Sequence, residues 1–152
     1  MAMVIVNANP EDNYILTEIT KKSKGYWGYS DEQMEKWSDV LTITKSYIET
    51  NNVYKSLMDN EVVGYYSYYN LDENVVKIDN LFVLPTYIGK GCGKFLMNDF
   101  MMRIKSEKAQ KIVLDSDPNS QKFYEKFGFI KVGQIETTIE DRFLPIMELK
   151  LY

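Results

Sequence analysis

The stretch from Leu81 to Lys94 constrains this chain more than any other part of its sequence. An apolar segment that predicts a strand runs into Pro85, and a short loop follows with glycine at positions 89, 91 and 93. Apolar residues then recur at helical spacing. Glycine lets backbone N–H groups turn toward a ligand, and the first turn of a helix leaves N–H donors unpaired. The stretch therefore predicts an anion-binding loop, suited to a phosphate, between a strand and a helix.

Two common phosphate-binding motifs do not fit this loop. A Walker A loop needs Ser or Thr after its lysine, and here Phe95 follows Lys94. The dinucleotide fingerprint fails because Lys94 or Leu96 stands where its third glycine belongs. Lys90 and Lys94 still add mobile positive charge. A glycine-rich loop without a ligand remains the alternative interpretation.

Length and charge limit the class of protein. At 152 residues the chain is expected to form one domain, 1–152, with a single substantial core. With 18 basic and 22 acidic residues its net charge is −4, which disfavours a nucleic-acid-binding protein. No apolar run approaches the length of a membrane span, and the first residues lack the features of a signal peptide. A cytoplasmic protein without nucleic-acid or membrane partners is expected.

Two absences limit the chemistry. The chain has no histidine, which excludes Ser-His-Asp and Cys-His nucleophilic machinery. Its single cysteine, Cys92, excludes an internal disulfide and a thiolate zinc site. No ligand spacing indicates a carboxylate metal site, so no metal is expected. Any catalysis is expected to rely on Tyr, Asp or Glu side chains, backbone dipoles and a bound cofactor.

Periodicity and turn signals predict the elements in chain order. Strands are expected at 4–7, 53–58, 62–69, 75–84, 111–115, 129–137 and 143–151, with turns at Asp59–Asn60 and Glu140–Asp141. Helices are expected from Asn9 to Gly25, from Ser30 with an apolar face of Met34, Trp37 and Val40, as one turn around Tyr47 and Ile48, at 91–108, and from Asp117 to Gly128. This order predicts a mixed sheet with helices on both faces.

The glycine loop resembles the pyrophosphate loop of the GNAT acyl-CoA N-acyltransferases. That loop has Arg or Gln, two residues of any type, Gly, any residue, and then Gly or Ala. Here the pattern runs from Ile88 to Gly93, with Gly91 at the first required glycine. It departs at its first position, where Ile88 replaces Arg or Gln. The contacts that backbone amides make are not affected by this departure.

A second motif strengthens the resemblance. In GNAT proteins the helix after the next strand typically opens with Asn and carries an aromatic-Tyr pair before a Gly-Phe. This sequence has Asn119, then Phe123–Tyr124, then Gly128–Phe129, about 30 residues after the glycine loop. The two motifs and the strand order cover about residues 53–137. The resemblance implies the GNAT fold, an α/β (α+β) fold with a mixed central sheet of about seven strands flanked by helices on both faces.

The resemblance also implies acetyl-CoA (coenzyme A) as acyl donor and no metal. In this family two parallel strands splay apart and admit the pantetheine arm, whose amides pair with the free backbone groups. The implied cofactor-binding residues come from the strand, the loop and the second motif. They are Leu81, Phe82, Val83, Ile88, Gly89, Lys90, Gly91, Cys92, Gly93, Lys94, Asn119, Phe123 and Tyr124.

GNAT enzymes transfer the acyl group directly from thioester to amine, which implies three roles. A backbone N–H near Phe82 or Val83 polarises the carbonyl. Tyr124 matches the family's tyrosine and is the implied general acid for the departing thiolate; its alternative is a Tyr packed in the core. Asp79 lies where many relatives carry an acid and is the implied base, through water. Its alternative is a solvated strand residue or substrate-binding acid.

Several other residues keep two interpretations. Cys92 is either a thiol activated at a helix start or a side chain packed under the loop. Trp27 and Tyr29 either enclose an acceptor substrate or cover the core. The run from Tyr65 to Tyr69 predicts a strand with aromatic residues on both faces, alternate members facing a partner subunit of a homodimer or the acceptor cleft. Residues 142–145 are expected to shape that cleft.

The expected function is therefore the transfer of an acetyl group from acetyl-CoA to a primary amine of a small molecule or a protein. The acidic balance mildly favours a cationic acceptor. The first alternative is a non-catalytic sensor that binds CoA or acyl-CoA, which Ile88 favours and Tyr124 disfavours. The second is a purely structural or interaction protein.

Overall fold

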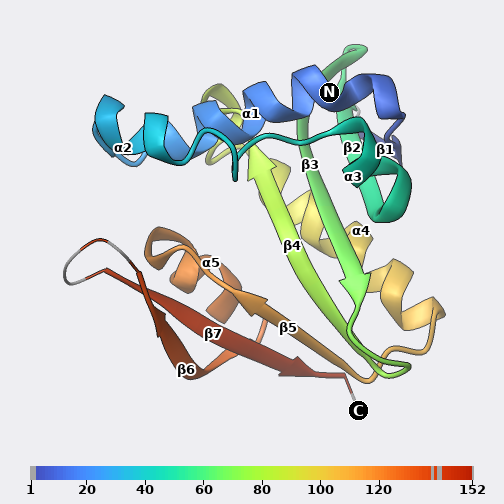
Figure 1. Ribbon diagram of the computed structural model, residues 1–152. Helices are drawn as coiled ribbons and strands as arrows, with labels where there is room; N and C mark the ends of the chain where they lie inside the picture. The colour runs from blue at the N-terminus through green and yellow to red at the C-terminus, as the bar shows by residue number, and fades with distance from the viewer. Residues whose placement is uncertain (1–2, 138, 140–141, 152) are drawn as a thin grey trace. The chain divides into compact units, whose positions relative to one another are not determined.

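The strands and helices of the chain follow one another in nearly the expected order. The computed structural model describes residues 3–137, 139 and 142–151 (Figure 1). The strands are β1 (Met3–Asn7), β2 (Asn52–Met58), β3 (Glu61–Asn70), β4 (Val75–Val83), β5 (Lys111–Asp115), β6 (Ile130–Glu136) and β7 (Phe143–Lys150). The helices are α1 (Asn13–Gly25), α2 (Asp31–Lys36), α3 (Lys45–Thr50), α4 (Cys92–Ser106) and α5 (Gln121–Glu125), with 3-10 turns η1 (Pro10–Asp12), η2 (Pro85–Tyr87) and η3 (Pro118–Ser120). The predicted turn at Glu140–Asp141 lies outside the described residues.

Within the described residues the strands form a seven-stranded sheet in the order β1-β2-β3-β4-β5-β7-β6. The pairs β1–β2, β2–β3, β5–β7 and β6–β7 are antiparallel. β4 and β5 are parallel, as a crossover through α4 requires. This confirms the predicted mixed sheet of about seven strands.

The parallel ladder between β4 and β5 is short. It joins Val75–Lys77 to Lys111–Val113 and, in the described part of the chain, ends there, although β4 runs on to Val83 and β5 to Asp115. Backbone N–H and C=O groups beyond the ladder need other partners. β4 therefore runs on beyond its ladder with β5.

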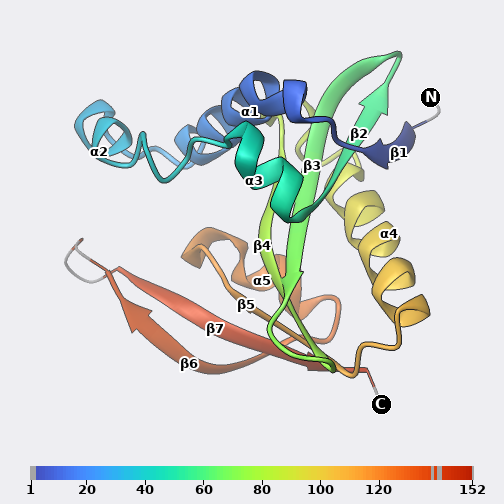
Figure 2. The same ribbon diagram turned by 45° about the vertical axis from the view of Figure 1, so that its right-hand side comes forward.

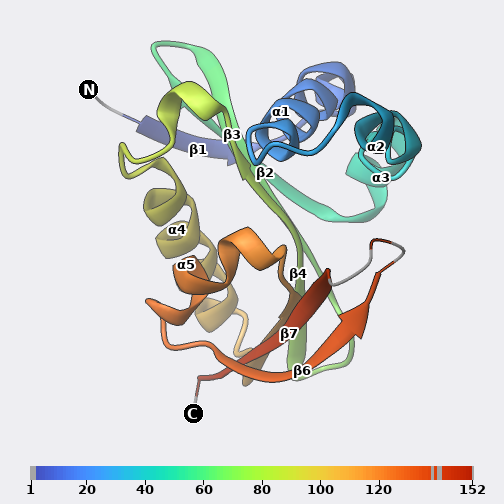
Figure 3. The ribbon, with the colours of Figure 1, turned by 90° about the vertical axis from the view of Figure 1, so that its left-hand side faces the viewer.

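The chain forms two compact units. The first comprises Met1–Tyr68 and Asn80–Met102, and the second comprises Tyr69–Asp79 and Arg103–Tyr152, so β3 and β4 run through both. In the first unit α1, α2 and α3 lie on one side of the strands and α4 lies on the other (Figures 2 and 3). The second unit carries β5, β7, β6 and α5. The predicted helices on both faces are confirmed.

The tyrosines of β3 alternate between these two layers of helices. The Tyr65 hydroxyl lies 2.5 Å from Thr20 Oγ1 of α1. Tyr66 and Tyr68 meet the ring of Phe100 of α4 edge-on, with ring centroids 5.5 and 5.3 Å apart. All three tyrosines are at most 1% exposed. Aromatic residues on both faces are thus confirmed, but the prediction that they face a partner subunit or an acceptor cleft is wrong for these three, because helices of their own chain cover them.

The helices before β2 differ in length from the prediction. Helix α1 ends at Gly25 as expected, and Ser30 caps α2 by accepting a hydrogen bond of 3.1 Å from the Gln33 N–H. Helix α2 then ends at Lys36, and the side chain of Val40 is 78% exposed, so the predicted apolar face is wrong at Val40. The segment after Lys36 holds Ser, Asp and Val in succession, all weak helix formers, which explains the early end.

Candidate functional site

The glycine loop joins β4 to α4 inside the first unit. After η2, the N–H of Ile88 donates to the carbonyl of Pro85 (3.2 Å) and the N–H of Lys90 donates to that of Tyr87 (3.3 Å). Gly89 and Gly91 adopt φ of +81° and +83°. An L side chain rarely adopts this backbone conformation, although a Cβ at either position would meet no atom within 4 Å. Glycine is therefore needed for the path of the backbone, and the space beside it is open.

The loop presents a row of amide donors at the start of α4. The first bond of this helix runs from the N–H of Phe95 to the carbonyl of Gly91 at 2.9 Å. The N–H groups of Cys92, Gly93 and Lys94 therefore precede the helical ladder, where no intrahelical carbonyl reaches them. The side chains of Lys90 and Lys94 are exposed, and the Lys90 ammonium lies 5.6 Å from the ring centre of Tyr87. Together the amides and the two cations suit an anion such as a phosphate.

Two side chains of the loop face opposite ways. Ile88, at the position where the resemblance implies Arg or Gln, is 37% exposed. Cys92 is 1% exposed, and its Sγ lies 3.6 Å from the Sδ of Met3 on β1. Burial raises the pKa of the Cys92 thiol, which disfavours the thiolate. The packed interpretation of Cys92 agrees with this geometry, and the activated-thiol interpretation does not.

The three residues predicted to bind the cofactor through their backbone lie at the end of β4. Leu81 and Phe82 are half-buried and Val83 is buried. The Phe82 ring lies 6.1 Å from the ring of Tyr65, on the side of α1. Directly after the strand, the N–H of Leu84 donates to the carbonyl of Val63 on β3 at 2.8 Å. The segment is thus held against β3.

A polar network that the sequence interpretation missed lies beside this segment. The Asn80 side-chain amide donates to the hydroxyls of Tyr47 (3.1 Å) and Ser67 (3.0 Å), and those two hydroxyls are 2.8 Å apart. Ser67 is fully buried. Strand alternation offered a signal, because Asn80 stands between Ile78 and Phe82 on one face of an apolar strand. The partners on α3 and β3 had no sequence signal.

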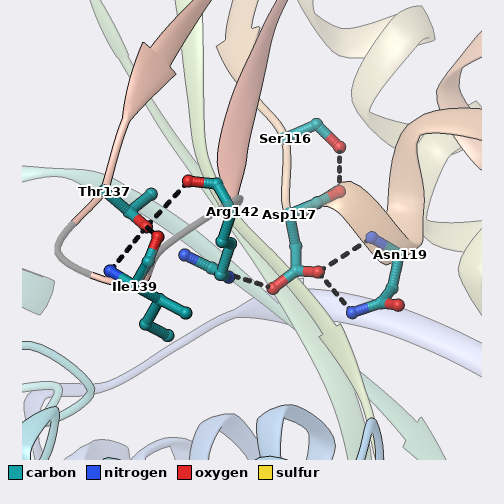
Figure 4. A network of polar contacts seen from close by, with 6 residues as sticks. All are labelled: Ser116, Asp117, Asn119, Thr137, Ile139 and Arg142. Atoms are coloured by element: carbon teal, nitrogen blue, oxygen red, sulfur yellow. Dashed lines mark hydrogen bonds and ion pairs between the residues drawn. The ribbon is translucent and has the colours of Figure 1, made fainter.

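In the second unit the segment after β5 is organised around Asp117 (Figure 4). The Oδ1 of Asp117 accepts hydrogen bonds from the backbone N–H of Asn119 (2.9 Å) and from its side-chain amide (2.8 Å). The Oδ2 of Asp117 pairs with Arg142 Nη2 at 3.0 Å. The two charged side chains are only 11% and 13% exposed. Asp117 therefore caps η3 at the start of the helix expected from Asp117, and its carboxylate also pairs with a cation from 25 residues further along the chain.

Further contacts tie Arg142 to the end of β6. The Thr137 hydroxyl donates to the carbonyl of Arg142 at 2.9 Å and accepts from the N–H of Ile139 at 3.1 Å (Figure 4). The Ser116 N–H donates to the carbonyl of Pro145 at 2.8 Å. The segment 142–145 is thus fixed to the segment that precedes α5.

Tyr124 and Phe123 lie on α5. Tyr124 is 7% exposed, and its ring packs edge-on against those of Phe123 (5.2 Å) and Phe129 (5.7 Å). Burial raises the pKa of the Tyr124 phenol, and the negative charge of Asp117 raises it further. The phenol is therefore protonated at neutral pH and has a proton to donate. It is also a packed residue, which agrees with the core interpretation, and its role as general acid stays a prediction.

The remaining predicted residues are more exposed. Asp79 on β4 is exposed, and its charge contributes to the raised pKa of Lys77, whose main cause is a hydrogen bond to Asp115. Trp27 is 42% exposed and meets the ring of Tyr26 edge-on at 5.1 Å. Tyr29 meets the ring of Trp37 at 4.8 Å, with the Lys24 ammonium 5.4 Å from the Tyr29 ring centre. Tyr29 thus takes part in a packed cluster, whereas Trp27 presents an open surface.

Comparison with known proteins identifies one family. Residues 28–151 match the family described as "Acetyltransferase (GNAT) domain". Among curated proteins, the chain is 42% identical over 52 residues to glucosamine 6-phosphate N-acetyltransferase of Trypanosoma brucei brucei, covering 34% of this chain and 35% of that protein. It is 35% identical over 81 residues to the ribosomal protein bS18-alanine N-acetyltransferase of Haemophilus influenzae, covering 51% of this chain and 54% of that protein. The chain thus matches about a third and about half of the lengths of these two relatives.

Solved structures share the fold along the whole chain. The PaiA N-acetyltransferase of Thermoplasma acidophilum, in complex with coenzyme A, has a TM-score of 0.81 at 22% identity and covers 99% of both chains. A GNAT family acetyltransferase of Elizabethkingia anophelis with acetyl-CoA bound has a TM-score of 0.71 at 17% identity and covers 98% of both chains. Among the described residues, no three His, Cys, Asp or Glu side chains gather as a metal site, and no helix is long and apolar enough to span a membrane.

Proposed function

The chain belongs to the GNAT acetyltransferase family, and from that premise we propose that it transfers an acetyl group from acetyl-CoA to a primary amine. The observation that carries the proposal is the loop between β4 and α4, where Gly89 and Gly91 turn the backbone beside open space and the N–H groups of Cys92 to Lys94 precede the helical ladder. Those donors suit the pyrophosphate of coenzyme A. Lys90 and Lys94 supply its counter-charge.

We assign the remaining cofactor contacts to both motifs. The backbone of Leu81, Phe82 and Val83 pairs with the amides of the pantetheine arm, since the ladder between β4 and β5 ends before these residues. The backbone from Ile88 to Lys94 receives the pyrophosphate. Asn119, Phe123 and Tyr124 contact the arm near the thioester. The fit depends on backbone groups, so Ile88 weakens one contact and leaves the others.

The chemistry needs one bond to form and one to break. The amine nitrogen attacks the thioester carbonyl carbon, the new C–N bond forms, and the C–S bond breaks to leave a thiolate. Tyr124, whose phenol is protonated at neutral pH, donates its proton to that sulfur. A backbone N–H of Phe82 or Val83 stabilises the charge on the carbonyl oxygen. Asp79 receives the ammonium proton through water, which reaches its exposed carboxylate.

The acceptor is a primary amine of a small molecule or a protein. The names of the two curated relatives support this class of acceptor, since they specify an amino sugar phosphate and a protein alanine. The net charge of −4 mildly favours a cationic acceptor. Trp27, exposed at the end of α1, and Tyr29 line the acceptor side in this proposal. A cytoplasmic location and a homodimer stay predictions.

One alternative has an observation in its favour. A CoA-binding sensor without turnover is favoured by Ile88, which removes a side-chain contact to the cofactor. Tyr124 favours the enzyme, because it stands at the position of the family's tyrosine.

The first experiment is thermal unfolding with acetyl-CoA, CoA or NAD. We expect an upward shift of several degrees with the two CoA species and none with NAD, since a ligand that binds only the folded chain stabilises it. Release of CoA is then measured with a panel of amines that includes polyamines, aminoglycosides, amino sugars and peptides. A shift without release for any amine would favour the sensor. No shift with any CoA species would overturn both proposals.

A further inference from the structure

Gly64 on β3 lies at a point where the end of β4 leaves no room for a side chain. A Cβ at Gly64 would stand 2.9 Å from the carbonyl oxygen of Phe82, 3.1 Å from Leu96 Cδ1 and 3.2 Å from Ser56 Oγ. A contact below 3.0 Å with a backbone oxygen is not tolerated, so one of the two strands would have to move. Only glycine allows β4 to approach β3 in this way.

The atoms packed around Gly64 leave no space for a methyl group. Ser56 stands opposite Gly64 in the β2–β3 register and is fully buried. Its Oγ is the one fully buried side-chain nitrogen or oxygen atom that lacks a hydrogen-bond partner in the part of the chain that the structure describes. Leu96 of α4 is also fully buried. Packed atoms thus close the space on three sides.

The contact also orients one peptide group. The nearest atom to a Gly64 methyl is the Phe82 oxygen, so this carbonyl points toward β3. The Phe82–Val83 peptide is planar and trans, which places the N–H of Val83 on the side opposite to that oxygen. The N–H of Val83 therefore points away from β3. The next amide, that of Leu84, turns back and donates to Val63 at 2.8 Å.

We propose that Gly64 is a positioning residue that holds the Phe82–Val83 peptide, and that the N–H of Val83 is the donor to the thioester carbonyl. This inference rests on the proposed function. It names the N–H of Val83, and not that of Phe82, as the donor. It also assigns the orientation of this donor to a residue on the neighbouring strand β3. A methyl group at residue 64 pushes the Phe82 oxygen away, rotates the peptide and turns the Val83 N–H from its direction.

The test compares Gly64→Ala with Gly133→Ala. A Cβ at Gly133 on β6 meets only Ile146 Cδ1, at an ordinary 3.5 Å, so this variant controls for adding a methyl group to a strand. Three properties are measured for each variant: the amide NMR shifts of Phe82, Val83 and Leu84 without ligand, kcat for acetyl transfer, and the Kd of adenosine 3′,5′-bisphosphate. The last compound is CoA without its 4′-phosphopantetheine group, so it keeps one of the two pyrophosphate phosphates for the glycine loop and has no group that reaches the end of β4.

We expect Gly64→Ala to shift the Phe82–Leu84 amides and to lower kcat about a hundredfold, the usual effect of losing one such donor. The bisphosphate Kd is expected to stay within about twofold, because the loop does not move, whereas a general loss of structure would weaken it too. Gly133→Ala is expected to change none of the three. Unchanged amide shifts, unchanged kcat, or a bisphosphate affinity that falls together with kcat would each overturn the inference.

A second variant covers the case in which Gly64→Ala fails to fold. Ser56→Ala/Gly64→Ala removes the unpaired hydroxyl and relieves the 3.2 Å contact, but it keeps the contact with the Phe82 oxygen. Its kcat is expected to fall as in the single variant. If the wild-type protein binds no CoA species, the proposed function fails on that result alone. The amide shifts then still decide whether Gly64 holds the Phe82–Val83 peptide.

Discussion

The glycine loop of the first unit and the Asp117 network of the second solve different problems with different parts of the chain. In the proposed function the loop binds its ligand through backbone amides of consecutive residues, and two glycines at φ +81° and +83° set the path of that backbone. The network works through side chains, with Asp117 joined to Arg142 from 25 residues away. The first arrangement depends on a few consecutive residues, whereas the second forms only when the chain folds.

The difference has a consequence for mutation. Backbone donors do not change when a side chain changes, so we expect the loop to bind its ligand with Ile88 in place of Arg or Gln. A buried ion pair has no such tolerance, because removing one partner leaves the other charge without compensation. The two regions are therefore expected to respond in opposite ways to conservative replacement.

The largest expected effect tests the chemistry of the second unit. Tyr124→Phe removes the proton donor and keeps the ring that packs on Phe123 and Phe129, so kcat is expected to fall about a hundredfold or more with little change in the KM for acetyl-CoA. The raised pKa keeps the phenol protonated as pH rises. The kcat of the wild type is therefore not expected to fall through Tyr124 ionisation between neutral pH and about pH 10.

Tyr14→Phe is the matched control for that variant, since Tyr14 is 75% exposed on α1. Steady-state kinetics with the same amine should leave its kcat at the wild-type value. An unchanged kcat in Tyr124→Phe would show that Tyr124 is a packing residue only, and the second unit would then have no assigned proton donor.

The second prediction tests whether side chains hold the second unit together. Arg142→Met leaves the buried Asp117 carboxylate without its cationic partner. It is expected to lower the free energy of unfolding by about 3 kcal/mol, as the breaking of a buried pair does. Lys36→Met is the control, because its pair with Glu32 spans 3.7 Å between side chains that are 66% and 83% exposed. That exposed pair should contribute about 0.5 kcal/mol or less. Urea unfolding of both variants measures the difference, and equal losses would contradict it.

The third prediction tests the backbone nature of the loop. Gly91→Ala forces an L residue to φ +83° and is expected to weaken CoA binding about tenfold, although the new methyl group meets no atom within 4 Å. Ile88→Ala changes only a side chain and is expected to leave the Kd within about twofold. Titration calorimetry with CoA compares the two. A larger loss for Ile88→Ala than for Gly91→Ala would show that side chains, not amides, bind the ligand.

The smallest effect concerns Cys92. Because burial raises the thiol pKa and limits access, iodoacetamide is expected to modify the folded chain far more slowly than the urea-unfolded chain. Cys92→Ala is expected to retain wild-type kcat. Rapid modification of the folded chain together with loss of turnover would restore the activated-thiol interpretation.

The elements that the sequence predicted best are those with strong local signals. The strand at 111–115 has the predicted bounds, and α1 ends at the predicted Gly25. The prediction failed after Lys36, where weak helix formers end α2 and leave Val40 exposed. It also failed for the tyrosines of β3, since alternation places side chains on two faces but does not say what covers each face. Packing against Thr20 and Phe100 decided that.

The sequence by itself determined the order of the elements, the family, and the glycine loop, because each depends on residues close together along the chain. Only the tertiary structure decided that Asp117 holds Arg142, that Asn80 joins Tyr47 and Ser67, and that the carbonyl of Phe82 occupies the space beside Gly64 where a side chain would stand. These contacts join residues separated by 13 to 33 positions, and their distances depend on strand pairing and helix packing. The residue type at one position does not specify which atom will lie next to it after folding, so these contacts follow only from the folded structure.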